Sequence, residues 1–222
     1  FPKDLTEVVA QENGLSIDHA GYSECMAQQK ERAREATKFD DDFANEEHWE
    51  LLTESSSTDF IGYETLNAKG KTLRYREIGD SIYLVLDQTP FYAESGGQRG
   101  DQGTITGDGI SLIVEDTVKI LGFYIHKCSL KQGLLSPTTI RAVETKVDPE
   151  LRQKTARNHS ATHLLHTALQ THLSSDVAQQ GSYVDSHRLR FDYSFHRPIS
   201  ETESSQIEDL VNKVIQENLP IS

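Results

Sequence analysis

The chain has 222 residues, of which 36% are hydrophobic and 26% charged, and its formal net charge is −13. This length suits one large domain or two small ones, and two cysteines are too few for a disulfide framework, so we expect reduced thiols. No apolar run is long enough to span a membrane and no signal peptide opens the chain, so we expect no membrane contact. Since Met26 is the only methionine, residue 1 is expected to be a boundary made by processing or cloning.

The acidity belongs to the first part of the chain. Residues 1–62 carry a net charge of −10, whereas residues 63–140 and 141–222 carry −1 and −2. Basic residues in the last part, among them Arg157 and Arg188, permit contact with phosphates, and an ordinary solvated surface is the alternative.

Residues 1–52 are predicted to form an acidic helical linker segment. Asp4 is expected to cap a short helix through Thr6–Ala10. Asp18 is expected to cap a longer helix from His19 to about Thr37, which is rich in polar helix formers.

Residues 53–147 are predicted to form a small glycine-rich antiparallel β-barrel, entered through a polar linker at Thr53–Asp59. Short β-prone runs follow one another closely here, and glycines mark the turns between them, which is typical of a small barrel or folded sheet. The predicted strands are Ser81–Leu86, Ser111–Glu115, Leu121–Lys127 and Thr138–Val143.

Residues 148–222 are predicted to form a helix–strands–helix unit. Asp148 followed by Pro149 is typical of a helix start, and the helix is expected to continue to about Leu173. Strands are then predicted at Gly181–Val184 and Leu189–Tyr193, the second with alternating apolar and polar residues.

The last helix begins with the capping box formed by Ser200 and Glu203. An apolar stripe follows along one face of this helix and consists of Ile207, Leu210, Val211, Val214 and Ile215. The order of helices, barrel and helix–strands–helix unit assigns the chain to the α+β class.

The most informative feature is the pair His159 and His163 on the first helix of that last unit. Imidazoles four residues apart on a helix share one face, which is how a helix offers two ligands to a metal ion, most often zinc. Ordinary hydrogen-bonded or exposed histidines are the alternative. A zinc-protease motif would need a glutamate where Ser160 stands. Thr162 either offers its hydroxyl to a small polar substrate or bonds its own helix backbone.

Two other segments accompany the histidines. Thr89–Gly103 contains a double glycine but has neither dinucleotide nor P-loop spacing, so it predicts a turn-rich wall where backbones approach closely. Gln180 is expected on a strand that faces the histidine helix, where it either points toward the metal face or has a structural role.

These segments together resemble the post-transfer editing region of the alanyl-tRNA synthetase family. The opening residues resemble the segment just before that region in the bacterial and organellar type of the enzyme, so the resemblance covers essentially the whole chain. The matching segments, in the same order as in the family, are Phe1–Leu5, Gln28–Arg34, Pro90–Gln98, Gly100–Gly103, Asn158–His166, Gln180–Ser182 and Leu189–Asp192.

The resemblance implies an editing fold of the threonyl/alanyl-tRNA synthetase common type, cut short at its C-terminal end. It implies a hydrolase that clears tRNA(Ala) mischarged with serine or glycine at its 3′ end. In the family, two histidines of this motif and a later cysteine and histidine bind zinc, and His159 and His163 take the first two places. Thr162 and Gln180 match positions implicated in amino-acid discrimination.

The later pair of zinc ligands is expected beyond Ser222, so the resemblance implies two of four Zn²⁺ ligands in this chain. The aminoacylation domain, with its ATP and Mg²⁺, is expected before Phe1. A free-standing trans-editing deacylase and a non-catalytic tRNA-binding module are the alternatives, and the acidic helical leader disfavours the first. We expect a protein of the cytoplasm or of an organellar matrix.

Overall fold

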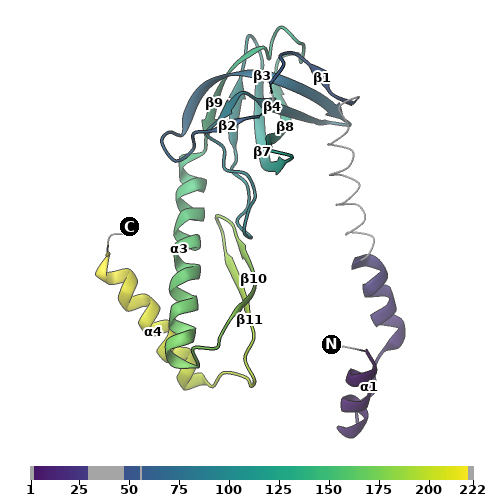
Figure 1. Cartoon of the computed structure of the whole chain (residues 1–222), viewed down its shortest axis with the longest axis vertical. Coiled ribbons are helices and arrows are strands. Elements are labelled where there is room, and N and C mark those ends of the chain that lie inside the picture. Colours follow the sequence, from purple (N-terminus) through teal and green to yellow (C-terminus); the bar gives the residue numbers. More distant parts are fainter. Residues whose placement is uncertain (1–2, 30–47, 56, 220–222) are drawn as a thin grey trace. The chain divides into compact units, whose positions relative to one another are not determined.

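The computed structural model describes residues 3–29, 48–55 and 57–219, and the chain divides into two units, 1–48 and 49–222 (Figure 1). None of the helices in these described stretches is long and apolar enough to cross a membrane.

The first unit contains α1 (Lys3–Glu12) and a second helical stretch at residues 19–29. Asp18 caps the second stretch as predicted, because its Oδ1 accepts the backbone N–H groups of Ala20 and Gly21 at 3.1 and 2.9 Å. The prediction for Asp4 was wrong: α1 already begins at Lys3, so Asp4 lies inside its first turn. The remainder of the predicted helix, up to Thr37, lies outside the described residues.

The second unit opens with a closed antiparallel barrel. Its strand order is β3-β4-β8-β7-β6-β9, and the ring closes because β9 pairs with β6 on one side and with β3 on the other. Closure gives each of these six described strands two partner strands. They are β3 (Asn67–Ile78), β4 (Ser81–Leu86), β6 (Gly103–Thr106), β7 (Ser111–Ile120), β8 (Phe123–Gln132) and β9 (Ala142–Val147).

Three short strands accompany the barrel. β1 (Glu50–Leu51) pairs antiparallel with β3, so the second unit begins a few residues before the start predicted for the barrel region. β2 (Asp59–Phe60) and β5 (Gln88–Thr89) form a parallel pair. The predicted linker before β2 is not purely solvent-exposed, because Thr58 is buried and its hydroxyl donates to the carbonyl of Leu86 at 2.8 Å.

The strand predictions were uneven. β4 has the predicted bounds, whereas β8 begins two residues late because Leu121 and Gly122 adopt positive φ angles of 49° and 85° in the hairpin turn. The strand predicted at Thr138–Val143 was wrong. Thr139 donates its backbone N–H to Ser136 O at 3.1 Å and so closes a turn, and β9 starts only at Ala142.

The barrel core is apolar and contains one histidine. Leu84, Phe91, Leu112 and other side chains of the core cluster are fully buried. His126 is also fully buried, and its ring nitrogens lie 2.7 Å from the Thr89 hydroxyl and 3.0 Å from the Leu84 carbonyl. Burial lowers the pKa of His126 to about 4, so the ring is neutral at pH 7.

A long helix, α3 (Pro149–His172), leaves the barrel and carries the rest of the unit (Figure 1). Asp148 caps it as predicted, accepting the N–H groups of Glu150 and Leu151 at 2.9 and 3.0 Å. The hairpin of β10 (Gln179–Val184) and β11 (Leu189–Tyr193) lies along α3, and both strands contact it.

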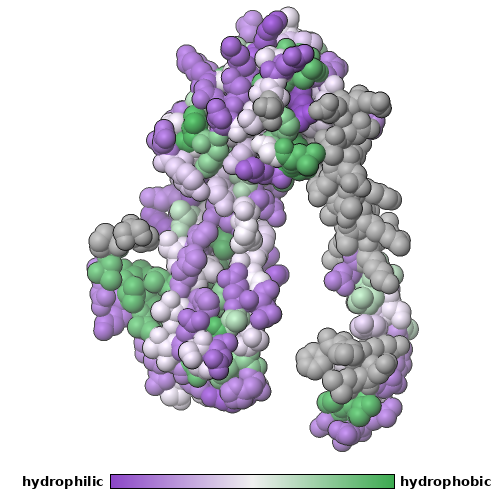
Figure 2. Space-filling view, in the orientation of Figure 1, coloured by the Kyte–Doolittle hydropathy of each residue, from purple (hydrophilic) through white to green (hydrophobic). Residues whose placement is uncertain are grey.

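α4 (Glu201–Glu217) packs against another side of α3. The predicted capping box of Ser200 and Glu203 is present, and Ile207 from the predicted stripe is buried in a second small core with Leu169. The far end of the stripe is not covered: Ile215 is 53% exposed, and apolar residues gather on the visible surface of α4 (Figure 2).

One ion pair, between a half-buried arginine and a buried aspartate, connects the barrel to α3. Arg152, one turn into the helix, forms a salt bridge with Asp101, whose side chain is 5% exposed. The guanidinium also donates to the carbonyls of Gly62 and Pro90, each at 2.9 Å. Asp101 in turn accepts the backbone N–H of Tyr92 at 2.7 Å. A single side chain therefore holds three barrel segments at the start of the helix.

We expect Arg152→Met to lower the free energy of unfolding by about 3–5 kcal/mol, because it leaves the buried Asp101 carboxylate without its counterion. The matched control is Arg190→Met, since Arg190 and Asp192 form an exposed pair with 66% and 46% exposed side chains. That variant should lose less than about 1 kcal/mol in the same urea titration. Equal losses in both variants would contradict the assignment of Arg152 as the junction.

His126 should make the barrel acid-sensitive. Because its folded pKa of about 4 is lower than the ordinary 6.5, the stabilisation is complete above pH 6.5 and is lost as the pH falls toward 4. Lowering the pH from 7 to 5 should remove on the order of 2 kcal/mol through this residue. His126→Gln, measured by urea unfolding at both pH values, should lose less stability on acidification than the parent chain.

Candidate functional site

The candidate site lies on one face of α3. Arg152 and His159 are seven residues apart, as are Thr155 and Thr162, so each pair is separated by two helical turns and shares a face. Thr155 and Thr162 are buried and His159 is half-buried, whereas His163 at the margin is exposed. The face that begins at the barrel junction therefore continues directly into the predicted histidine pair.

The two histidines are brought together as predicted. Their Nε2 atoms lie 3.1 Å apart and their ring centroids 5.1 Å apart. Two nitrogens bound at about 2.0–2.1 Å to one tetrahedral zinc ion would be roughly 3.3 Å apart, so the separation of the two Nε2 atoms is close to that of two ligands of one ion.

Gln98 fixes the orientation of the first histidine. Its Oε1 lies 2.6 Å from His159 Nδ1, and Gln98 as a whole residue is only 8% exposed. An amide oxygen only accepts, so Nδ1 carries the proton and Nε2 keeps its lone pair toward His163. Burial and the neighbouring His163 also lower the pKa of His159, which favours the neutral, ligating form.

Gln98 reaches the helix because its loop docks on the hairpin. Arg99 donates its N–H to Val184 O at 2.9 Å, and Val184 donates to Gly97 O at 2.8 Å. Gly97 has a φ of 83°, and a Cβ there would lie 2.3 Å from Ser182 O. Only glycine permits this approach, as the prediction of a turn-rich wall with close backbones requires.

Thr162 takes the backbone-bonded alternative in the structure. Its hydroxyl donates to the Asn158 carbonyl at 2.9 Å, and the residue is 7% exposed. A hydroxyl that donates in this way keeps its oxygen lone pairs as acceptors. Its predicted role in discriminating amino acids stays a prediction.

Gln180 lies at an irregularity of the hairpin. Gln179 pairs with Tyr193 and Gly181 with Asp192, so Gln180 is the extra residue of a bulge. It is exposed, and its Nε2 lies 3.4 Å from the Oγ of Ser194, the residue directly after β11. The bond that the structure shows for this side chain therefore runs to the hairpin and not to α3, and its predicted role stays a prediction.

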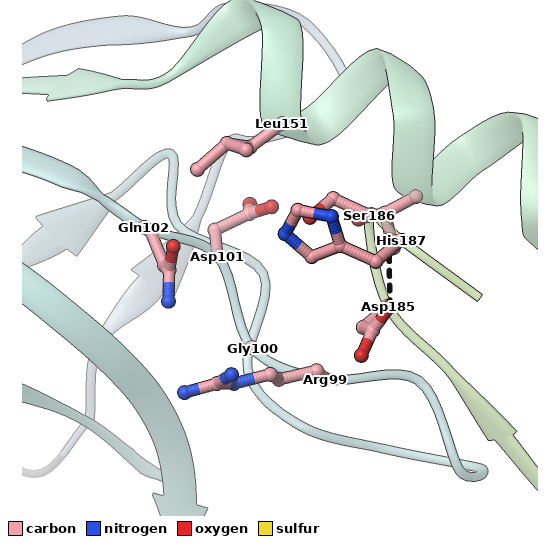
Figure 3. A pocket seen from close by; sticks show the side chains of 9 residues that line it. Arg99, Gly100, Asp101, Gln102, Leu151, Asp185, Ser186 and His187 are labelled. Atoms are coloured by element: carbon pink, nitrogen blue, oxygen red, sulfur yellow. Dashed lines mark hydrogen bonds between the residues drawn. The ribbon is translucent and has the colours of Figure 1, made fainter.

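A polar cavity of about 120 Å³ lies between the glycine loop, α3 and the β10–β11 turn (Figure 3). The imidazole of His187 and the carboxylate of Asp101 both point toward this space. Asp101 is neutralised by Arg152, and the side chain of Asp185 is held by the N–H groups of His187 and Arg188. The cavity thus adjoins the helix face one turn before His159.

The donor set fits half of a zinc site. Two imidazoles with neighbouring Nε2 atoms, one of them oriented by a buried amide through its other nitrogen, are an arrangement that zinc-binding histidines adopt. Within the described stretches of the chain, no group of three His, Cys, Asp or Glu side chains is placed to hold a metal ion.

Sequence reasoning missed two members of this arrangement. Gln98 lies in the segment that was predicted to form a turn-rich wall. A long amide side chain among glycines could have indicated a hydrogen bond to a residue outside the loop. The pairing of Asp101 with Arg152 joins residues 51 positions apart, which no local pattern marks.

Comparison with known proteins places these residues in a wider context. Residues 1–151 match the family model of class II (A) tRNA synthetases. The whole chain is 41% identical to the alanine–tRNA ligase of Francisella philomiragia, 40% to that of Mesorhizobium japonicum and 42% to that of Parvibaculum lavamentivorans. The aligned stretch makes up 26% of each relative, so the chain spans about a quarter of their length.

Gln98→Leu should abolish the tautomer preference of His159 while leaving the loop in place, because the Gln98 backbone is held separately by Ser95. The ¹⁵N chemical shifts of the ring should move toward those of a mixed tautomer, and zinc affinity should fall by about 10–100-fold. Gln102→Leu is the matched control in the same loop, because Gln102 bonds Glu115 O instead. An unchanged His159 ring spectrum in Gln98→Leu would refute the assignment.

Proposed function

The chain belongs to the class II (A) tRNA synthetase family and is related over its whole length to alanine–tRNA ligases, and on this premise we propose that it supplies their editing function. The motif resemblance to alanyl-tRNA synthetases is thereby confirmed. The proposed reaction is hydrolysis of tRNA(Ala) mischarged with serine or glycine, within an enzyme that attaches alanine to tRNA(Ala) with ATP.

The closeness of His159 and His163 carries the proposal. Their 3.1 Å contact, set by the buried Gln98, supports a site for Zn²⁺ on the face of α3 that continues from the barrel junction. When bound at such a position, zinc supplies polarisation of a carbonyl or activation of a water.

The side chains around the pair would position an aminoacyl ester. Thr162 Oγ donates to its own helix and would accept a hydrogen bond from the hydroxyl of a seryl group. The close packing of Gly97 on Ser182 supports a narrow wall beside the pair, which favours small amino acids. Glycine would be accepted because it is small.

Hydrolysis then needs a water near the ester carbonyl. The water oxygen adds to the carbonyl carbon, the bond from that carbon to the ribose oxygen breaks, and the ribose oxygen takes up a proton. The products are a free amino acid and an uncharged tRNA. Exclusion of bulky acyl groups is the task of the wall and of Thr162, and orientation of His159 is the task of Gln98.

A non-catalytic tRNA-binding module is the second candidate. It is favoured by the absence of a third metal-binding side chain around the pair among the described residues. Zinc binding and hydrolysis together distinguish the two functions.

The test is deacylation of Ser-tRNA(Ala) by the chain and by a version that continues past Ser222, with zinc content measured on both. We expect His159→Ala and His163→Ala in the longer version to lower zinc affinity by more than about 100-fold and to abolish hydrolysis. His19→Ala, a histidine of the first unit, is the control and should change neither quantity.

If both histidine variants keep their zinc and their hydrolysis, the proposed site is wrong. If tRNA binds but neither version hydrolyses the ester, the non-catalytic candidate replaces the hydrolase.

A further inference from the structure

Four aromatic rings cluster on the barrel close to the junction with α3. The Phe60 ring is stacked on Tyr124 with centroids 5.4 Å apart and planes within 2° of each other. Tyr63 and Tyr92 meet the same Phe60 ring edge-on, at 5.1 and 6.2 Å. Phe60 is thus the centre of the cluster, and the other three rings surround it.

The cluster is open to solvent. Tyr63 is 85% exposed, the largest exposed fraction among the large hydrophobic side chains of the described residues, and the other three rings are half-buried. Lys119 adds a positive charge, with its Nζ 5.0 Å from the centroid of the Tyr124 ring. Flat exposed rings next to a cation are the components with which proteins bind unpaired bases.

The ion pair of Arg152 and Asp101 fixes the backbone under these rings. Arg152 donates to the carbonyl of Gly62, the residue before Tyr63, and Asp101 accepts the N–H of Tyr92. An exposed ring on an anchored backbone loses less conformational freedom when it binds a ligand than a ring on a mobile loop. The cluster is therefore preorganised as well as exposed.

We propose that Phe60, Tyr63, Tyr92 and Tyr124, with Lys119 beside them, form a stacking surface for unpaired nucleotides at the 3′ end of an RNA. We call this set the aromatic surface. The choice of an RNA end rests on the proposed function, because the ester to be hydrolysed would be carried by such an end. The rings, their exposure and the adjacent cation are independent of it.

The position of the aromatic surface agrees with this role. The residue that anchors it, Arg152, precedes His159 by two turns on the same face of α3, a rise of about 10 Å. If the aromatic surface binds bases at the junction, the 3′ end of the RNA would extend along the face of α3 that carries the histidine pair.

Stacking rather than phosphate attraction would supply the affinity. Asp59 and Glu64, both exposed, flank Phe60 and Tyr63 in the chain and oppose phosphates, while Lys119 is the cation seated on a ring of the surface. One neutralised phosphate on a single strand gives a slope of about −0.7 in log K against log salt. The aromatic surface therefore predicts weak dependence on salt and tolerance of base identity.

The test is fluorescence anisotropy with a single-stranded RNA of eight nucleotides that ends in CCA, carries no amino acid and is labelled at its 5′ end. We expect Tyr63→Ala to weaken binding by at least about fivefold and Tyr63→Phe to retain it, since stacking needs the ring and not the hydroxyl. Lys119→Gln should flatten the salt dependence. Tyr22→Ala, the same exchange at an exposed tyrosine of the first unit, should leave binding unchanged.

Equal binding by Tyr63→Ala and the parent chain, with both unfolding at the same urea concentration, would overturn the proposal and would leave the ring a purely structural partner of Phe60. The oligonucleotide carries no ester, so this outcome is separate from deacylation. If Tyr63→Ala lost binding while no version hydrolysed Ser-tRNA(Ala), the aromatic surface would stand and the proposed hydrolase would fall.

Discussion

The ion pair of Arg152 and Asp101 is the constraint on which the arrangement of the second unit depends. A guanidinium has five N–H donors in a rigid fork, and four of them here bond a carboxylate and two backbone carbonyls from different barrel segments. A lysine ammonium, with three donors on a single nitrogen, could not bond the carboxylate and both carbonyls in this geometry. The helix that carries the histidines thereby starts at a fixed place on the barrel. The positions of the residues further along its face depend on that start.

The second consequence of this junction is chemical. The segment after Tyr92 is held by Asp101, so the glycine loop reaches the hairpin in one register and delivers Gln98 to His159 at 2.6 Å. The proton on Nδ1 is thus determined by a residue 61 positions earlier in the chain, and the lone pair on Nε2 faces His163 as a result. Barrel and helix each contribute to the same pair of nitrogens.

The sequence predicted what local rules control. The caps at Asp148 and Ser200, the hairpin strands and the spacing of His159 and His163 depend on residues within a turn or two of each other. The closure of the barrel through β3 and β9, and the pairing of Arg152 with Asp101, depend on contacts between distant positions that no periodicity marks. Thr138–Val143 shows the same limit locally, because side-chain bonds in a turn outweighed its β propensity.

The proposed division between an aromatic surface and a histidine site has a consequence for selectivity. Stacking on the bases does not distinguish one attached amino acid from another, since the rings would contact the RNA end whichever acyl group it carries. It therefore binds correct and incorrect substrates equally and cannot discriminate between them, because only interactions that differ between substrates do so. In the proposed function, discrimination would have to arise at the far end of the helix face, where Thr162 would present one oxygen and the Gly97 wall would limit size. A contact with a hydroxyl alone separates serine from alanine, which differ by that oxygen, whereas glycine lacks it and has to be separated from alanine by fit.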